Sequence, residues 1–198
     1  IFADADSPVF MQGAFEISEA NMADLGRVER AFRGDERGAG HHGRCPCLFS
    51  GMERFFRPGY RAHLLAEWLP ALEGVVAKLE QGGARVADIG CGHGASVVLM
   101  VEAFPLARFT AFDARGLHRL RALAPDGTFM VVEPRAGDSL EQNINPVGRL
   151  YLASSTMICM PVALDQAPEG RALGAQAGGA VLREAGFNRV RVAAETPF

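Results

Sequence analysis

The chain has 198 residues, enough for one ordinary domain or for a domain with an appendage. Hydrophobic residues make up 48% and charged residues 22%, which is typical of a soluble globular protein. The net charge of −3 argues against a general nucleic-acid binder, which usually carries a basic surplus. We expect no signal peptide and no membrane-spanning helix, because no uninterrupted apolar run approaches the ~18 residues that such a helix needs.

The four cysteines are Cys45, Cys47, Cys91 and Cys159. Cys45 and Cys47 flank a single proline and follow His41 and His42, which at first resembles a metal cluster. Zinc sites, however, use cysteines two to four residues apart together with a second ligand pair, and no second pair follows here. We therefore expect no metal, incidental thiols in a loop, no disulfide framework and a reducing cytoplasmic location.

The first part of the chain predicts helices separated by a glycine-rich loop. Residues 9–32 place apolar side chains at helical spacing, and residues 33–51 interrupt the pattern with glycines. Pro58 is expected to open the next helix, because proline suits a first helical turn. Its buried face extends to Leu79, and Pro70 either kinks it or divides it in two.

Short apolar strands then alternate with helices. Predicted strands span 85–89, 108–112, 128–133 and 189–193, and predicted helices span about 95–104, 117–123, 147–160 and 178–185. This alternation predicts an α/β fold with a doubly wound, mostly parallel sheet. The helix at 147–160 is apolar around most of its circumference, so we expect it to be core or to line an apolar pocket.

The most informative motif joins the strand at 85–89 to the following helix. Asp88 is followed by Gly90, Gly92 and Gly94 at alternate positions. Glycine adopts positive φ and lets a ligand approach the backbone where a Cβ would clash. Ligands of open α/β sheets bind at the carboxyl ends of the strands, where this loop belongs.

The spacing of the motif discriminates between cofactors. Dinucleotide sites use Gly-x-Gly-x-x-Gly, whereas here the three glycines alternate and an acid, Asp88, precedes them. A carboxylate there would repel a pyrophosphate but would accept hydrogen bonds from a cationic amino group, which S-adenosylmethionine (SAM) carries. Asp113 ends the second strand, and an acid at that position can hold both ribose hydroxyls.

These residues resemble the first two motifs of class I SAM-dependent methyltransferases. The turn Leu123-Ala124-Pro125-Asp126-Gly127-Thr128 is similar to the family's turn before its fifth strand, and the run from Glu53 to Phe198 resembles one bacterial subgroup. The resemblance implies a Rossmann-like fold. It assigns Asp88, Gly90, Gly92 and Gly94 to the methionine part of SAM, Asp113 to the ribose, and Tyr60 or Arg57 to the carboxylate. Cys91, within the glycine loop, is a further expected cofactor contact. Core packing is the default reading of Tyr60.

The resemblance also implies an organisation and an activity. Residues 1–57 would form an N-terminal helical, lid and dimerisation segment, and residues 58–198 the SAM-binding domain of a homodimer. We expect transfer of the SAM methyl group to a small, fairly apolar acceptor, leaving S-adenosylhomocysteine. His41 and His42 are candidate bases, although solvated loop histidines are the plainer reading. The alternative function is a SAM-binding regulator without catalysis, and a nicotinamide-dependent oxidoreductase is disfavoured by the glycine spacing.

The family's sheet has seven strands, whereas this chain supplies about four. Only residues 114–127 separate the second predicted strand from the segment that resembles the fifth, and each further parallel strand needs a crossover of a dozen or more residues. We therefore expect part of the sheet to be missing, with further residues belonging between Asp113 and Ala114. A genuine deletion is the alternative.

Overall fold

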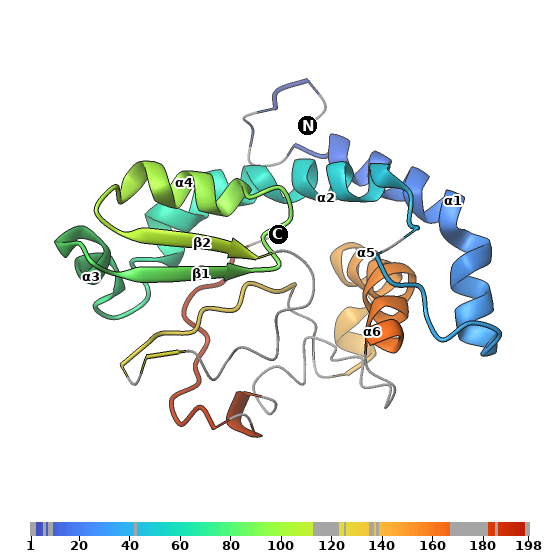
Figure 1. Cartoon of the computed structure of the whole chain (residues 1–198). Helices are drawn as coiled ribbons and strands as arrows, with labels where there is room; N and C mark the ends of the chain where they lie inside the picture. Colours follow the sequence, from blue (N-terminus) through green and yellow to red (C-terminus); the bar gives the residue numbers. More distant parts are fainter. Residues whose placement is uncertain are drawn as a thin grey trace. The chain divides into compact units, whose positions relative to one another are not determined.

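The computed structural model describes residues 3–5, 7, 10–41, 43–112, 123–124, 126–134, 137, 139–166, 182–184 and 186–196 (Figure 1). The chain forms two compact units. The first comprises Ile1–Ile17, Phe49–Val131 and Ala193–Pro197, and the second comprises Ser18–Leu48, Val132–Val192 and Phe198. The functional division into residues 1–57 and 58–198 stays a prediction; one helix runs across that boundary.

Two helices begin the chain, α1 (Gln12–Arg33) and α2 (Pro46–Gly59). The first confirms the helix predicted at 9–32, and it ends at Gly34, whose φ of 81° suits the left-handed position after a helix. The second corrects the sequence interpretation, because Pro58 lies inside α2 rather than at a helix start. Pro46 occupies the first position instead, where the N–H that proline lacks has no helical partner to lose.

The next helical segment is divided, as the position of Pro70 predicted. The π-helix η1 (Tyr60–Trp68) follows α2 directly, and α3 (Val75–Gln81) follows after a break. Leu64 and Leu79, from the two pieces, are both buried in one apolar core. That core also contains Leu69, Met100 and Phe104.

The sheet contains the two strands β1 (Arg85–Ile89) and β2 (Arg108–Phe112), which pair in parallel (Figure 1). The register runs from Arg85 opposite Arg108 to Ile89 opposite Phe112. Helix α4 (Ala95–Ala103) joins them and contributes Met100 to the core. The predicted boundaries of both strands are confirmed, and so is the helix between them. At this coarse level the chain is a mixed helix and strand protein with a small parallel sheet.

The predicted strands at 128–133 and 189–193 are not found, because the described residues of both segments are not assigned as strand. A strand forms only with a hydrogen-bonded neighbouring strand, which a local apolar pattern does not specify. Most of the predicted helix at 117–123 and the Asp113–Ala114 junction lie outside the described residues. Of the helix predicted at 178–185, Leu182–Glu184 are described and helical, and Gly186 follows with a φ of 97°.

Four short helical pieces complete the second unit: η3 (Glu141–Asn143), α5 (Pro146–Ser154), η4 (Ser155–Cys159) and α6 (Met160–Gln166). Asn145 caps α5 by accepting a hydrogen bond from Gly148 N at 2.8 Å, and Pro146 takes the first position. The helix predicted at 147–160 is thereby confirmed, and it continues to Gln166.

The predicted burial of this helix is only partly found. Ile158 is buried, whereas Leu150 and Leu152 are 41% and 43% exposed. By length and composition alone, Pro146–Asp165 is apolar enough to cross a membrane, which corrects the expectation that no segment meets this criterion. One such helix does not establish a membrane protein.

Candidate functional site

The loop between β1 and α4 lies at the carboxyl end of β1 and contains the three glycines of the motif. Gly90, Gly92 and Gly94 have φ values of 80°, 51° and 80°, which residues with a Cβ rarely adopt. A Cβ built on any of the three would meet none of the described residues within 4 Å. The backbone conformation therefore favours glycine at all three positions.

Hydrogen bonds anchor this glycine loop to the end of β2. The carbonyl of Phe112 accepts from the backbone N of Gly90 at 2.7 Å and from that of Cys91 at 3.2 Å. Within the loop, Gly94 N donates to the Cys91 carbonyl at 2.8 Å. The residue after Phe112 is Asp113, the predicted ribose ligand, which lies outside the described residues.

Asp88 is partly buried near the end of β1, and it contacts a residue that the sequence interpretation missed. Ser96 Oγ, in the first turn of α4, donates a hydrogen bond to Asp88 Oδ2 at 2.6 Å. This bond fixes the carboxylate between the strand and the helix that flank the glycine loop. No described residue donates to the second oxygen, Oδ1. A hydroxyl in the first helical turn after the last glycine was the signal that could have identified Ser96.

Tyr60 belongs to the apolar core of the first unit. Its ring meets that of Trp68 edge to face, with centroids 5.9 Å apart, and it packs against the core formed around Leu64. Arg57, the other candidate for the SAM carboxylate, pairs with Glu53 at 3.3 Å. These contacts explain both side chains structurally, and their contact with a cofactor stays a prediction.

The candidate bases His41 and His42 precede α2 in the sequence. His41 belongs to the second unit, in the segment between α1 and α2, and His42 lies outside the described residues. Among the described residues no three His, Cys, Asp or Glu side chains form a group that could hold a metal. The catalytic role of either histidine stays a prediction.

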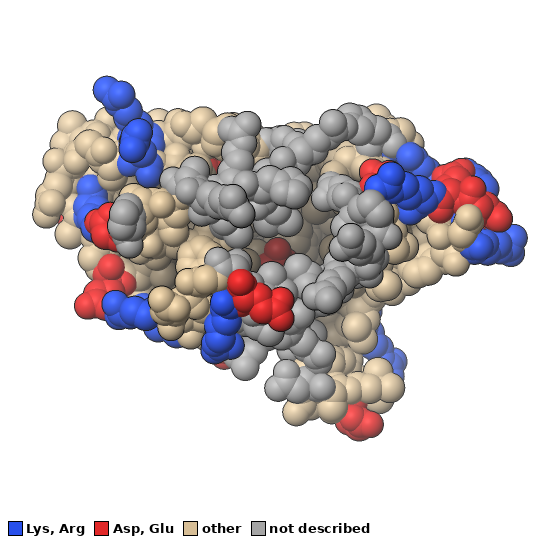
Figure 2. Space-filling view, turned by 60° about the horizontal axis from the view of Figure 1, so that its bottom comes forward, with Lys and Arg blue, Asp and Glu red and all other residues tan. Residues whose placement is uncertain are grey.

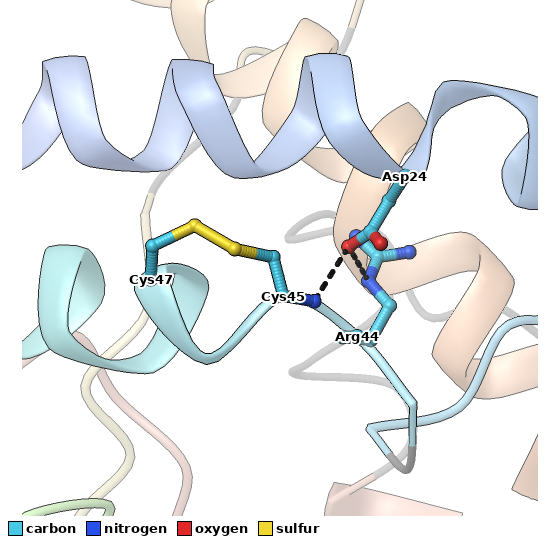
Figure 3. The surroundings of a disulfide bond; sticks show 4 residues. All are labelled: Asp24, Arg44, Cys45 and Cys47. Atoms are coloured by element: carbon cyan, nitrogen blue, oxygen red, sulfur yellow. Dashed lines mark hydrogen bonds and ion pairs between the residues drawn. A yellow bond between two sulfur atoms is a disulfide. The ribbon is translucent and has the colours of Figure 1, made fainter.

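Cys45 and Cys47 form a disulfide, with Cα atoms 5.2 Å apart (Figure 3). The expectation of incidental thiols is therefore wrong for this pair. The helix α2 begins between the two residues, at Pro46, and its first turn brings their side chains together. Cys91 and Cys159 are not part of a disulfide. The cytoplasmic location stays a prediction.

Two further surface features complete the description. A hollow of about 160 Å³ lies among Leu79, Phe104 and Leu106, at the amino ends of the strands and away from the glycine loop. Its volume is below the range of ordinary ligand pockets. On the described part of the face in Figure 2, basic and acidic side chains are interspersed.

Comparison of the sequence with protein-family models gives no match. Comparison with curated proteins gives no match either.

Proposed function

We propose that the protein binds SAM at the glycine loop and transfers its methyl group to a small, fairly apolar acceptor. The observation that carries the proposal is the loop itself. Three glycines with positive φ follow a parallel strand, none of the described residues would contact a Cβ on any of them, and a carboxylate lies two residues before the first. This combination suits a ligand with an amino group and no phosphate.

The described residues fit such a ligand in two respects. Backbone at Gly90, Gly92 and Gly94 permits close approach, since no Cβ occupies the space. Asp88 keeps Oδ1 for the α-amino group of SAM while Ser96 holds Oδ2. Asp113 would accept hydrogen bonds from the ribose hydroxyls.

SAM supplies the reactive sulfonium methyl when it is bound. The chain's own contribution is to orient the cofactor and to hold its charged amino group, because methyl transfer is an in-line displacement that depends on alignment. An acceptor seated in line with the methyl group would then need only a lone pair on O, N or C. The loop itself carries one imidazole, His93, to which we assign no catalytic role.

Calorimetric titration with SAM, with S-adenosylhomocysteine and with NAD tests the cofactor. We expect both sulfur ligands to bind with micromolar Kd, about −8 kcal/mol, and NAD not to bind. Saturable binding of NAD, with no heat from either sulfur ligand, would contradict the proposal. If SAM binds but no S-adenosylhomocysteine accumulates with any small acceptor, the protein is a SAM-binding regulator.

A further inference from the structure

The Cys45–Cys47 disulfide closes a very small loop in the second unit. Only Pro46 lies between the two cysteines. A disulfide that acts as a structural staple does so mainly by removing freedom from the unfolded chain, and this effect shrinks with the length of the closed loop. The pair therefore contributes little as a staple. In a reducing compartment, disulfides that occur are usually catalytic or redox-sensing.

The pair is held in place and remains reachable. Arg44 before it and Leu48 after it are 4% and 0% exposed, so both flanks are anchored in the interior. Cys45 and Cys47 are themselves partly exposed, and Pro46 is exposed. The backbone N of Cys45 also donates to Asp24 Oδ2 at 3.3 Å (Figure 3). Both cysteines are therefore partly accessible to solvent, as attack by a small thiol requires.

The surroundings of Cys45 favour its thiolate. Cys45 immediately precedes Pro46, the first residue of the 14-residue helix α2, so it lies at the positive end of the helix dipole. Helix N-termini and neighbouring cations both stabilise thiolates. A thiolate that is stabilised in this way is the better leaving group in disulfide exchange.

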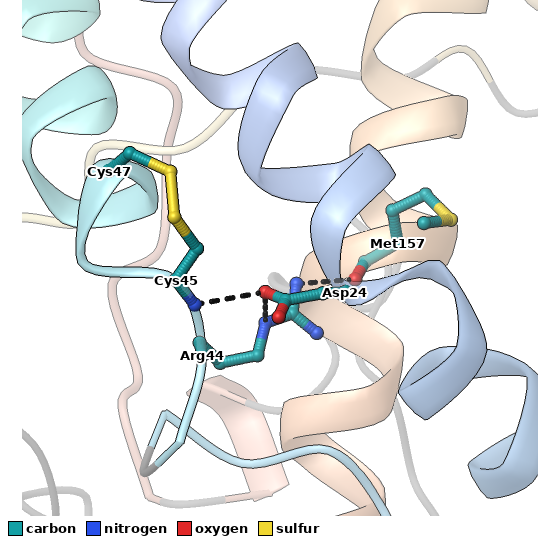
Figure 4. A network of polar contacts seen from close by, with 5 residues as sticks. All are labelled: Asp24, Arg44, Cys45, Cys47 and Met157. Atoms are coloured by element: carbon teal, nitrogen blue, oxygen red, sulfur yellow. Dashed lines mark hydrogen bonds and ion pairs between the residues drawn. A yellow bond between two sulfur atoms is a disulfide. The ribbon is translucent and has the colours of Figure 1, made fainter.

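Two guanidinium groups and one carboxylate lie around the segment before the disulfide. Arg44 Nε pairs with Asp24 Oδ2 at 2.9 Å, and Arg44 Nη2 donates to the Met157 carbonyl at 2.9 Å (Figure 4). Arg44 Nη1 is buried without a hydrogen-bond partner. Burial lowers the pKa of Arg44, Asp24 opposes that shift, and the charge of Arg27 adds to it. The balance of charge among these three groups is positive.

We propose that Cys45 and Cys47 form a redox-active pair that exchanges with low-molecular-weight thiols. The incoming thiolate attacks the sulfur of Cys47, forming a mixed disulfide there and breaking the Cys45–Cys47 bond. The electron pair of the broken bond goes to Cys45, which leaves as the thiolate. A second thiol then attacks the mixed disulfide, giving the oxidised small disulfide and reduced Cys47, which takes a proton from solvent. Two equivalents of thiol are oxidised for each protein disulfide reduced.

The first experiment exposes the full chain to 1 mM dithiothreitol, then to oxidised glutathione, and follows the pair by alkylation and mass spectrometry. We expect complete reduction within minutes and complete reoxidation, with an unchanged far-ultraviolet circular dichroism spectrum. The Cys91→Ser, Cys159→Ser double variant is the matched control and should behave identically. Reduction that occurs only in denaturant, or a pair that does not reoxidise, would overturn the proposal.

A second experiment tests the asymmetry between the sulfur atoms. Cys47→Ser retains Cys45, and Cys45→Ser retains Cys47; both are checked for folding by circular dichroism. At pH 7 we expect Cys45 to form a mixed disulfide with oxidised glutathione at least tenfold faster than Cys47. Cys159 is an internal reference, because burial raises its pKa and the charge of Glu133 adds to that shift. A Cys45 that reacts no faster than Cys159 would refute the assignment of the leaving thiolate.

Discussion

The two carboxylate oxygens of Asp88 have different roles at the edge of the glycine loop. Its Oδ2 accepts the hydroxyl of Ser96 at 2.6 Å, which ties the end of β1 to the first turn of α4. Its Oδ1 is the atom that we assign to the cofactor's amino group. Because a charged acceptor makes the stronger hydrogen bond, Asp88 should dominate affinity while Ser96 adjusts its orientation.

Substitution of these two residues tests the assignment. Asp88→Ala should weaken SAM binding by about 1.5–3 kcal/mol, the scale of a hydrogen bond to a charged group, and Ser96→Ala by about 0.5–1.5 kcal/mol. Calorimetry on variants with unchanged circular dichroism spectra measures both. Unchanged affinity in a folded Asp88→Ala variant would show that the residue is purely structural.

Asp24 and Arg44 form a buried ion pair in the second unit, with side chains 9% and 0% exposed. Removal of the carboxylate in Asp24→Ala leaves the guanidinium buried and uncompensated, so we expect a loss of about 3–5 kcal/mol in the free energy of unfolding. Urea denaturation measures this loss. The matched control is Glu29→Ala on the same helix, which removes an exposed pairing with Arg33 and should cost less than about 1 kcal/mol. Equal effects of the two variants would disprove the distinction.

At the scale of elements, α1 and α2 approach closely where both carry glycine. A Cβ on Gly13 would lie 2.5 Å from the Gly51 carbonyl oxygen, and one on Gly51 would lie 2.9 Å from Ile17 N. These neighbours are backbone atoms, which cannot move aside as a flexible side chain can. The absence of side chains at these two positions therefore sets the separation of the helices within the first unit.

Gly13→Ala should accordingly lower the free energy of unfolding by about 1–3 kcal/mol, as overpacking does. Gly59→Ala is the control, because Gly59 has helical dihedrals (φ −62°, ψ −44°) and open space around its Cα. We expect that variant to be unchanged or stabilised by about 0.4–1 kcal/mol. Chemical denaturation compares the two; a neutral Gly13→Ala variant would mean that the crossing is looser than described.

The elements that the sequence predicted well are those fixed by local chemistry. The strand before the glycine loop, the positive φ of its three glycines and the break near Pro70 all follow from short-range preferences. Residues 128–133 have the same apolar character as β1, yet they are not assigned as a strand, because strand formation depends on a neighbour that a local pattern does not report. The prediction that Pro58 begins a helix was wrong for a similar reason. Both Pro46 and Pro58 suit the first position of a helix, and the helix α2 begins at Pro46.

The candidate site shows the same division between local and long-range information. The glycine motif and Asp88 were identified from their spacing alone. Ser96 was missed because its partner lies across the loop, and the Cys45–Cys47 disulfide was missed because a single intervening residue is an uncommon spacing for a bridge. Both contacts depend on where a helix begins, and helix boundaries are the least certain feature of a sequence pattern.

At the scale of the whole molecule, the parallel sheet of the described residues is unusually small. Two parallel strands, β1 and β2, leave two edges, and parallel sheets are ordinarily buried among further strands and helices. The segment at 128–133 has strand-like composition but is not assigned as a strand. A central strand between β1 and this segment would extend the sheet. Such a strand would also resolve the conflict at Asp113 and Ala114 that the sequence shows.

We predict that the natural protein carries further residues between Asp113 and Ala114. Trypsin cleaves after Arg108 and Arg115, so a continuous chain must yield the peptide Phe109–Arg115. We expect mass spectrometry of the protein isolated from its source to lack this peptide and to show longer ones that begin at Phe109. The peptide Ala62–Lys78 serves as the recovery control. Detection of Phe109–Arg115 at comparable yield would establish a genuine deletion. In the family that the sequence resembles, the strands absent from this chain form one side of the methyl-acceptor site. Their deletion would therefore weaken the case for methyl transfer.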